Sequence, residues 1–153
     1  MCLSVTGNKS QLIDIICQYL IEHKGELEND HKLVITGADP VPQQIWNGQV
    51  QTRADLQTTH EEADVIVTQQ VSYLARSGKI NITVMADDTD IFVLLLHAYN
   101  EEKLTCGLVL SGTSPSRSST DIKATAEKHI GILKDLHPAH ILSGCDTVSC
   151  IWE

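Results

Sequence analysis

The chain has 153 residues, of which 42% are hydrophobic and 20% are charged, and its formal net charge is -9. This length is enough for one domain with a buried core, since a domain near this size buries about 70% of the surface that its unfolded chain exposes. The negative charge counts against a protein that binds nucleic acid or anionic membranes by electrostatic attraction alone. Bound divalent cations would neutralise part of this charge, so the charge does not exclude a phosphate-containing substrate.

The sequence carries no signal for a membrane or for secretion. No apolar run is long enough to cross a bilayer, and the N-terminus lacks the basic and apolar regions of a signal peptide. The number of cysteines, five, is odd, and their spacing is not that of a disulfide framework. Both features are typical of free thiols in a reducing compartment. We therefore expect an intracellular protein with no membrane partner.

The first third of the chain predicts a helix, a strand and a hairpin. Residues 10–25 carry apolar side chains at helical spacing, and residues 32–36 form a short apolar run typical of a buried strand. The pair Asn47-Gly48 lies between apolar residues, which is the pattern of a tight hairpin over residues 45–50.

The rest of the chain alternates helices and strands. The predicted elements are a helix over 59–78, a strand over 80–84, a helix over 91–99, a strand over 104–110 and a helix over 121–136. This rhythm implies crossover connections, and hence an α/β fold with a mainly parallel sheet and helices on both faces. In such sheets, functional groups collect at the carboxyl ends of the strands.

Three carboxylates directly follow the strand predicted over residues 80–84. Asp87, Asp88 and Asp90 repel one another, so a fold that gathers them there has a use for a cation or a proton. Asp88 and Asp90 could offer oxygens to one Mg²⁺ or Mn²⁺, with waters in the remaining positions. The alternative of equal weight is that Asp87 or Asp88 caps the following helix and the others are solvated.

Two further acidic positions could complete a metal site. Glu61, Glu62 and Asp64 lie in the first turn of a predicted helix, where the helix dipole also favours carboxylates. Asp146 lies in a Gly-Cys-Asp-Thr turn, where a lone aspartate is commonly a turn residue or a cap. Together they would allow two ions about 3.5–4 Å apart, which prepare a water and stabilise the leaving oxygen of a phosphodiester.

Two other features have simpler explanations. His137, His140, Cys145 and Cys150 have the ligand types of a zinc site. Their spacing is not that of a finger or a knuckle, so ordinary buried thiols and exposed histidines are favoured. The hydroxyl-rich segment 111–120 is interpreted as a surface connector.

The acidic motifs resemble a known family in order and spacing. Glu62-Ala63-Asp64, Asp88-Thr89-Asp90 and Gly144-Cys145-Asp146 are similar to the motifs of the PIN-like nucleases, specifically the flap endonuclease or XPG group. The whole chain also resembles transposon-associated animal proteins of that superfamily. The resemblance implies a PIN-like, Rossmann-like fold. Its implied metal-binding positions are Glu62, Asp64, Asp88, Asp90 and Asp146, of which Asp64, Asp88, Asp90 and Asp146 are also the catalytic ones.

The same resemblance implies a nuclease that hydrolyses phosphodiester bonds with Mg²⁺ or Mn²⁺. Its partner would be nucleic acid, DNA rather than RNA, and its location the nucleus rather than the cytoplasm. Such relatives have an earlier metal-binding aspartate, and a tyrosine where this chain has Thr147. We therefore expect a single PIN-like domain over residues 1–153 that is a fragment, incomplete at both ends.

Two alternatives remain open. A degenerate domain would keep the fold and bind nucleic acid or a protein partner without cutting it. A haloacid-dehalogenase-like phosphatase is the lesser alternative, because a strand followed by Asp88-Thr89-Asp90 also resembles the nucleophile motif of that family. There Asp88 would be phosphorylated and Asp90 would act as acid and base, but Phe92 stands where that family prefers threonine or valine.

Overall fold

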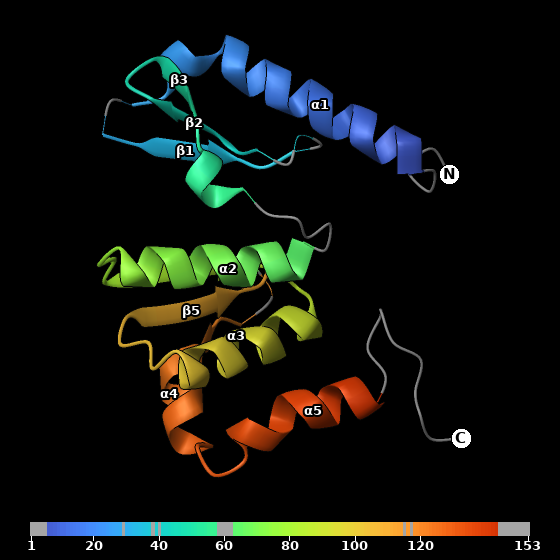
Figure 1. The fold of residues 1–153 in the computed structure, drawn as a ribbon, viewed down its shortest axis with the longest axis vertical. Helices are drawn as coiled ribbons and strands as arrows, with labels where there is room; N and C mark the ends of the chain where they lie inside the picture. The colour runs from blue at the N-terminus through green and yellow to red at the C-terminus, as the bar shows by residue number, and fades with distance from the viewer. Residues whose placement is uncertain are drawn as a thin grey trace. The chain divides into compact units, whose positions relative to one another are not determined.

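The computed structural model of the protein describes residues 6–28, 30–37, 39, 41–57, 63–114, 116 and 118–143. The chain divides into two compact units, Met1–Thr59 and His60–Glu153 (Figure 1). The described residues form α-helices and two small sheets, which confirms the predicted α/β class. Each unit has its own internal contacts, and the single domain over residues 1–153 stays a prediction. None of the described helices is long and apolar enough to span a membrane.

The first unit is a helix with an antiparallel sheet. Its elements are α1 (Thr6–Glu22), η2 (Lys24–Glu26), β1 (Lys32–Ile35), β2 (Gln43–Trp46), β3 (Gln49–Thr52) and η3 (Ala54–Leu56). The sheet order is β1-β2-β3. The predicted hairpin is confirmed, because Asn47 and Gly48 at its tip have φ angles of 49° and 68°, the left-handed conformation that a type I′ turn requires.

The second unit combines helices with a mixed sheet. Its elements are α2 (Ala63–Arg76), β4 (Asn81–Met85), α3 (Thr89–Glu101), β5 (Gly107–Ser111), β6 (Thr120–Asp121), α4 (Ile122–Lys128) and α5 (Leu133–Ser143). The crossover through α3 makes β4 and β5 parallel, as the rhythm predicts, whereas β6 returns antiparallel to β5. Parallel pairing in the described residues is therefore confined to β4 and β5.

Burial along β4 differs from the prediction of helices on both faces. Ile82 and Val84 are buried, whereas Asn81, Thr83 and Met85 are exposed. Alternation of this kind belongs to a strand with one covered face. The buried face of β4 belongs to a core in which α2, α3, α4 and α5 take part. The buried members of this core are Val71, Ile82, Val84, Ile91, Leu95, Leu96, Tyr99, Cys106, Leu108, Ile122, Ala126 and Leu133.

The single helix predicted over residues 121–136 is wrong. α4 ends at Lys128, and α5 begins only at Leu133, after a turn that contains Gly131. Glycine in a helix interior is unfavourable by about 1 kcal/mol relative to alanine, which favours a break there. Pro138 lies inside α5, although the sequence predicted it at the start of a separate element.

At the end of α3, the backbone of a residue other than glycine adopts the left-handed conformation. Lys103 has a φ of 51°, and the backbone N–H of Leu104 donates to the carbonyl of Tyr99 at 3.1 Å. The N–H of Lys103 donates to the carbonyl of Asn100 at 3.3 Å, which completes a Schellman motif. Glycine usually occupies this position, because a Cβ is unfavourable there.

We predict that Lys103→Gly raises the free energy of unfolding by about 0.5–1 kcal/mol. The left-handed conformation costs about 1–2 kcal/mol for a residue with a Cβ, and the greater freedom of glycine in the unfolded chain offsets part of the gain. Urea unfolding followed by circular dichroism measures the change. Lys103→Ala is the matched control, because it removes the charge but keeps the Cβ, and its stability should stay near that of the wild type. A less stable Lys103→Gly protein would contradict the prediction.

Candidate functional site

The acidic turn, residues 86–90, joins the carboxyl end of β4 to the start of α3. Asp88 is the N-cap of α3, and its Oδ1 accepts a hydrogen bond from the backbone N–H of Asp90 at 2.9 Å. This satisfies one of the backbone donors that a helix leaves unpaired at its start. The predicted alternative that Asp88 caps the helix is thus confirmed, and the same contact fixes where this carboxylate lies.

Asp87 joins the acidic turn to the loop after β5. Its Oδ1 accepts a hydrogen bond from the backbone N–H of Thr113 at 3.0 Å, and its Oδ2 accepts one from the Thr113 hydroxyl. Because β4 and β5 run parallel, their carboxyl ends are neighbours, and this contact links the two ends. Thr113, which lies in the segment interpreted as a surface connector, thus contacts the acidic turn. A hydroxyl-rich loop directly after a second parallel strand was the available sequence signal.

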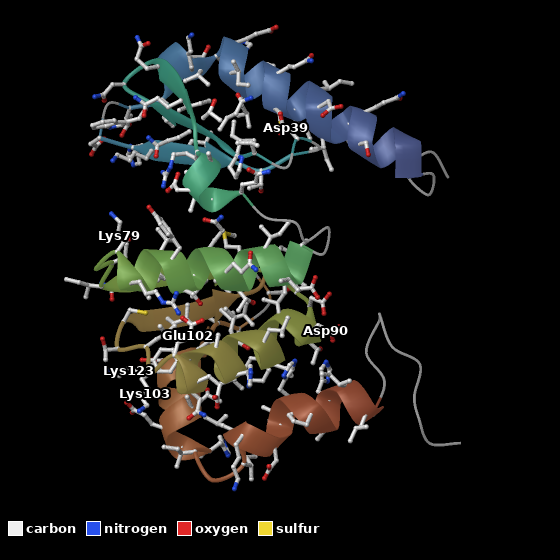
Figure 2. The ribbon with its side chains drawn as sticks, in the orientation of Figure 1. Asp39, Lys79, Asp90, Glu102, Lys103 and Lys123 are labelled. Atoms are coloured by element: carbon white, nitrogen blue, oxygen red, sulfur yellow. The ribbon has the colours of Figure 1, made fainter. Side chains whose placement is uncertain are left out.

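Asp90 joins the acidic turn to α5. Its Oδ1 lies 2.8 Å from Nε2 of His140, and the two side chains are only 15% and 21% exposed. The pair also joins α3 to α5, which pack against one another (Figure 2). Sequence reasoning missed this contact, because 50 residues separate the two partners and α5 itself was not predicted.

Two more histidines lie between α3 and α5. The rings of His97 and His137 have their centroids 4.5 Å apart. Burial lowers the pKa of His137, and the neighbouring His97 and His140 lower it further because a second positive charge there is unfavourable. Nδ1 of His97 is buried and has no hydrogen-bond partner in the described part of the chain. His97 follows Asp90 by seven residues, two helical turns, and that spacing was the sequence signal for it.

A pocket of about 260 Å³ borders the acidic turn. Asp87, Asp88, Phe92, Ser118 and Thr120 are among the residues that line it. A volume of this size holds several waters, since each takes about 30 Å³ in the liquid. The pocket therefore has room for a hydrated cation beside Asp88, whereas Asp90 does not line it.

The predicted site residues are described only in part. Asp64 lies in the first turn of α2, half-buried, and its backbone carbonyl accepts a hydrogen bond from the Thr68 hydroxyl at 2.9 Å. Glu62 and Asp146 lie outside the described residues, as do Glu61 and the two cysteines of the zinc alternative. The convergence of all three acidic motifs therefore stays a prediction.

The arrangement of elements bears on that convergence. α2 and α5 both pack against α3. Figure 1 shows the start of α2, the start of α3 and the end of α5 at the same end of the second unit. Asp64 lies in the first turn of α2, and Asp88 and Asp90 lie at the start of α3, so the described carboxylates of two motifs lie at this end of the unit.

The carboxylates of Asp64, Asp88 and Asp90 do not already form a cage. Over the ranges that the structure describes, three metal-ligand atoms lie within 4.8 Å of one another only in the group Glu28, Asp30 and His31. That group belongs to the first unit, where all three residues are exposed, and exposed acidic groups of this kind are common without a bound ion.

No family model matches the chain, and neither a curated protein nor a solved structure is significantly similar to it. The resemblance to PIN-like nucleases therefore stays a prediction. A fold alone does not assign an activity, so the residues of the acidic turn and their contacts must support any function.

We predict that Asp88→Ala lowers the free energy of unfolding by about 0.5–2 kcal/mol, because the backbone N–H of Asp90 loses its acceptor. Asp88→Asn keeps an acceptor oxygen and should unfold near the wild-type urea concentration. Both variants are measured in the presence of EDTA, so that no bound cation contributes. Equal destabilisation by the two substitutions would contradict the capping role.

Proposed function

We propose that the protein is a divalent-metal-dependent nuclease of the PIN-like type, with a Rossmann-like sheet, that hydrolyses phosphodiester bonds in nucleic acid with Mg²⁺ or Mn²⁺. The observation that carries the proposal is the acidic turn itself, which presents Asp88 and Asp90 directly after the parallel strand β4. In open α/β sheets, ligands bind outside the carboxyl ends of the strands. DNA is the preferred substrate in this proposal, and the nucleus the preferred location.

The contacts of the acidic turn leave oxygen atoms for a cation. The cap uses Oδ1 of Asp88, and the contact with His140 uses Oδ1 of Asp90. The Oδ2 atom of each side chain has no partner among the described residues. Carboxylate oxygens are the hard donors that Mg²⁺ and Mn²⁺ prefer. The donor set therefore fits either ion.

A full cage of protein ligands is not needed for such an ion. Mg²⁺ keeps several waters in proteins and is commonly held by one or two carboxylates together with substrate phosphates. Asp88 and Asp90 would hold the ion, and Asp64, Glu62 and Asp146 would complete the set. When bound, the cation supplies Lewis-acid stabilisation of the phosphate and makes an attacking water more acidic.

The other contacts of the acidic turn have supporting roles in this proposal. Asp87 engages both of its oxygens with Thr113, so it secures the loop after β5 and leaves the cation to its neighbours. His140 holds one oxygen of Asp90 and so fixes the direction of the other. Groups that orient a ligand in this way commonly matter for metal affinity.

One observation favours a second candidate, a degenerate domain that binds a partner without cutting it. Asp64, Asp88 and Asp90 do not bring three oxygens within 4.8 Å of one another. A domain that had lost its chemistry would keep Asp88 as a helix cap and Asp87 as a link to Thr113. Metal binding and cleavage must therefore be measured separately.

We predict that the wild-type protein cleaves single-stranded or flapped DNA with Mn²⁺, and that Asp88→Asn and Asp90→Asn reduce cleavage to background. Asparagine keeps the helix cap at position 88, so the loss would report on chemistry and not on folding. Labelled DNA and RNA oligonucleotides measure cleavage, and EDTA should abolish it. Asp30→Asn is the matched control, because Asp30 is an exposed carboxylate of the first unit.

The outcomes separate the two candidates. Cleavage that survives both Asp88→Asn and Asp90→Asn would contradict the assignment of the site. Absence of Mn²⁺ binding by calorimetry at millimolar concentrations, together with absence of cleavage by the wild type, would support the degenerate domain.

A further inference from the structure

The interface between α3 and α5 carries a set of nitrogen donors, of which the nuclease proposal uses only His140, to position Asp90. His97 comes from α3, and His137 and His140 come from α5. Their side chains are partly or largely buried where the two helices pack together. We propose that these three histidines bind one borderline transition-metal ion such as Zn²⁺.

The geometry brings the three rings into one neighbourhood. The rings of His97 and His137 lie with their centroids 4.5 Å apart and their planes tilted by 33°. His137 and His140 are three residues apart on α5, so their side chains project from the same face of the helix. One ion between the two helices can therefore meet a ligand from α3 and two from α5.

Nδ1 of His97 gives independent support for a ligand. This nitrogen is buried, and no hydrogen-bond partner reaches it in the described part of the chain. Buried polar atoms in proteins nearly always have a partner, and an orphaned one needs an explanation. A metal ion would use the lone pair of this nitrogen.

Asp90 supplies the partner that a metal-bound histidine usually has. Its Oδ1 lies 2.8 Å from Nε2 of His140, which leaves Nδ1 of the same ring for an ion. Ligating histidines almost always donate their other ring nitrogen to a carboxylate, a carbonyl or a water, which fixes the ring orientation. Asp90 would thus orient His140 through one oxygen and face the acidic turn with the other.

The chemistry of the donors selects the class of ion. Imidazole nitrogen suits Zn²⁺, Co²⁺ and Ni²⁺, whereas Mg²⁺ and Ca²⁺ prefer oxygen. The rings must turn about their side-chain bonds to meet one ion, because their nitrogens are not already within 4.8 Å of one another. Three protein ligands leave a fourth position for water, which is the open form of a zinc site.

The test is calorimetric titration of the full chain with Zn²⁺, together with absorption spectra of the Co²⁺ form. We expect one ion per chain, and binding that is lost in His137→Phe and in His97→Gln. Phenylalanine keeps an aromatic ring against His97 but has no donor atom, and circular dichroism shows whether each variant folds. Asp90→Asn should weaken binding about 10-fold or more.

His129→Gln is the matched control, because His129 is an exposed histidine at the end of α4 and should not affect the titration. Zn²⁺ binding that survives both His137→Phe and His97→Gln would overturn the proposal. So would thiolate bands in the Co²⁺ spectrum that Cys145→Ser or Cys150→Ser removes, since these cysteines would then be the ligands. Absence of stoichiometric binding to the wild type would overturn it as well.

Discussion

Three negative charges share one turn between β4 and α3, and the second unit accommodates them by giving each a different partner. Two such charges 4 Å apart repel by about 1 kcal/mol even in water, and by more where the turn is partly buried. Asp88 caps its own helix, Asp87 accepts hydrogen bonds from Thr113, and Asp90 meets His140. These contacts join the end of β4 to the loop after β5 and to α5, so the elements around the turn are positioned by the residues that would otherwise repel.

The contacts of the acidic turn also distinguish a carboxylate with a purely structural role from those that can still bind a cation. Asp87 has both oxygens engaged, whereas Asp88 and Asp90 each keep one without a partner among the described residues. Asp90 lies between two kinds of donor, with carboxylate oxygens in the turn and imidazole nitrogens between α3 and α5. Oxygen donors favour Mg²⁺ or Mn²⁺, and imidazoles favour Zn²⁺, so neighbouring sites of different preference are physically consistent.

Local patterns predicted the local parts of this molecule. The Asn47-Gly48 hairpin and the strand, turn and helix around Asp88 follow from neighbouring residues, and so does the helix cap. The contact of Asp90 with His140 spans 50 residues, and no local pattern encodes such a distance. The break between α4 and α5 was missed because buried residues on both sides keep a helical spacing, so periodicity alone continues across it. The acidic motifs thus identified candidate site residues, whereas the histidine that contacts Asp90 comes from α5, whose packing against α3 the sequence did not predict.

Anomalous diffraction from crystals soaked in MnCl₂ tests the central claim most directly, since it locates the ion without requiring activity. We predict a Mn²⁺ peak at the acidic turn, within coordination distance of the Oδ2 atoms of Asp88 and Asp90. Asp88→Asn should remove this peak while α3 keeps its cap. A map without a peak at the acidic turn, or with Mn²⁺ only at the exposed group of Glu28, Asp30 and His31, would contradict the account.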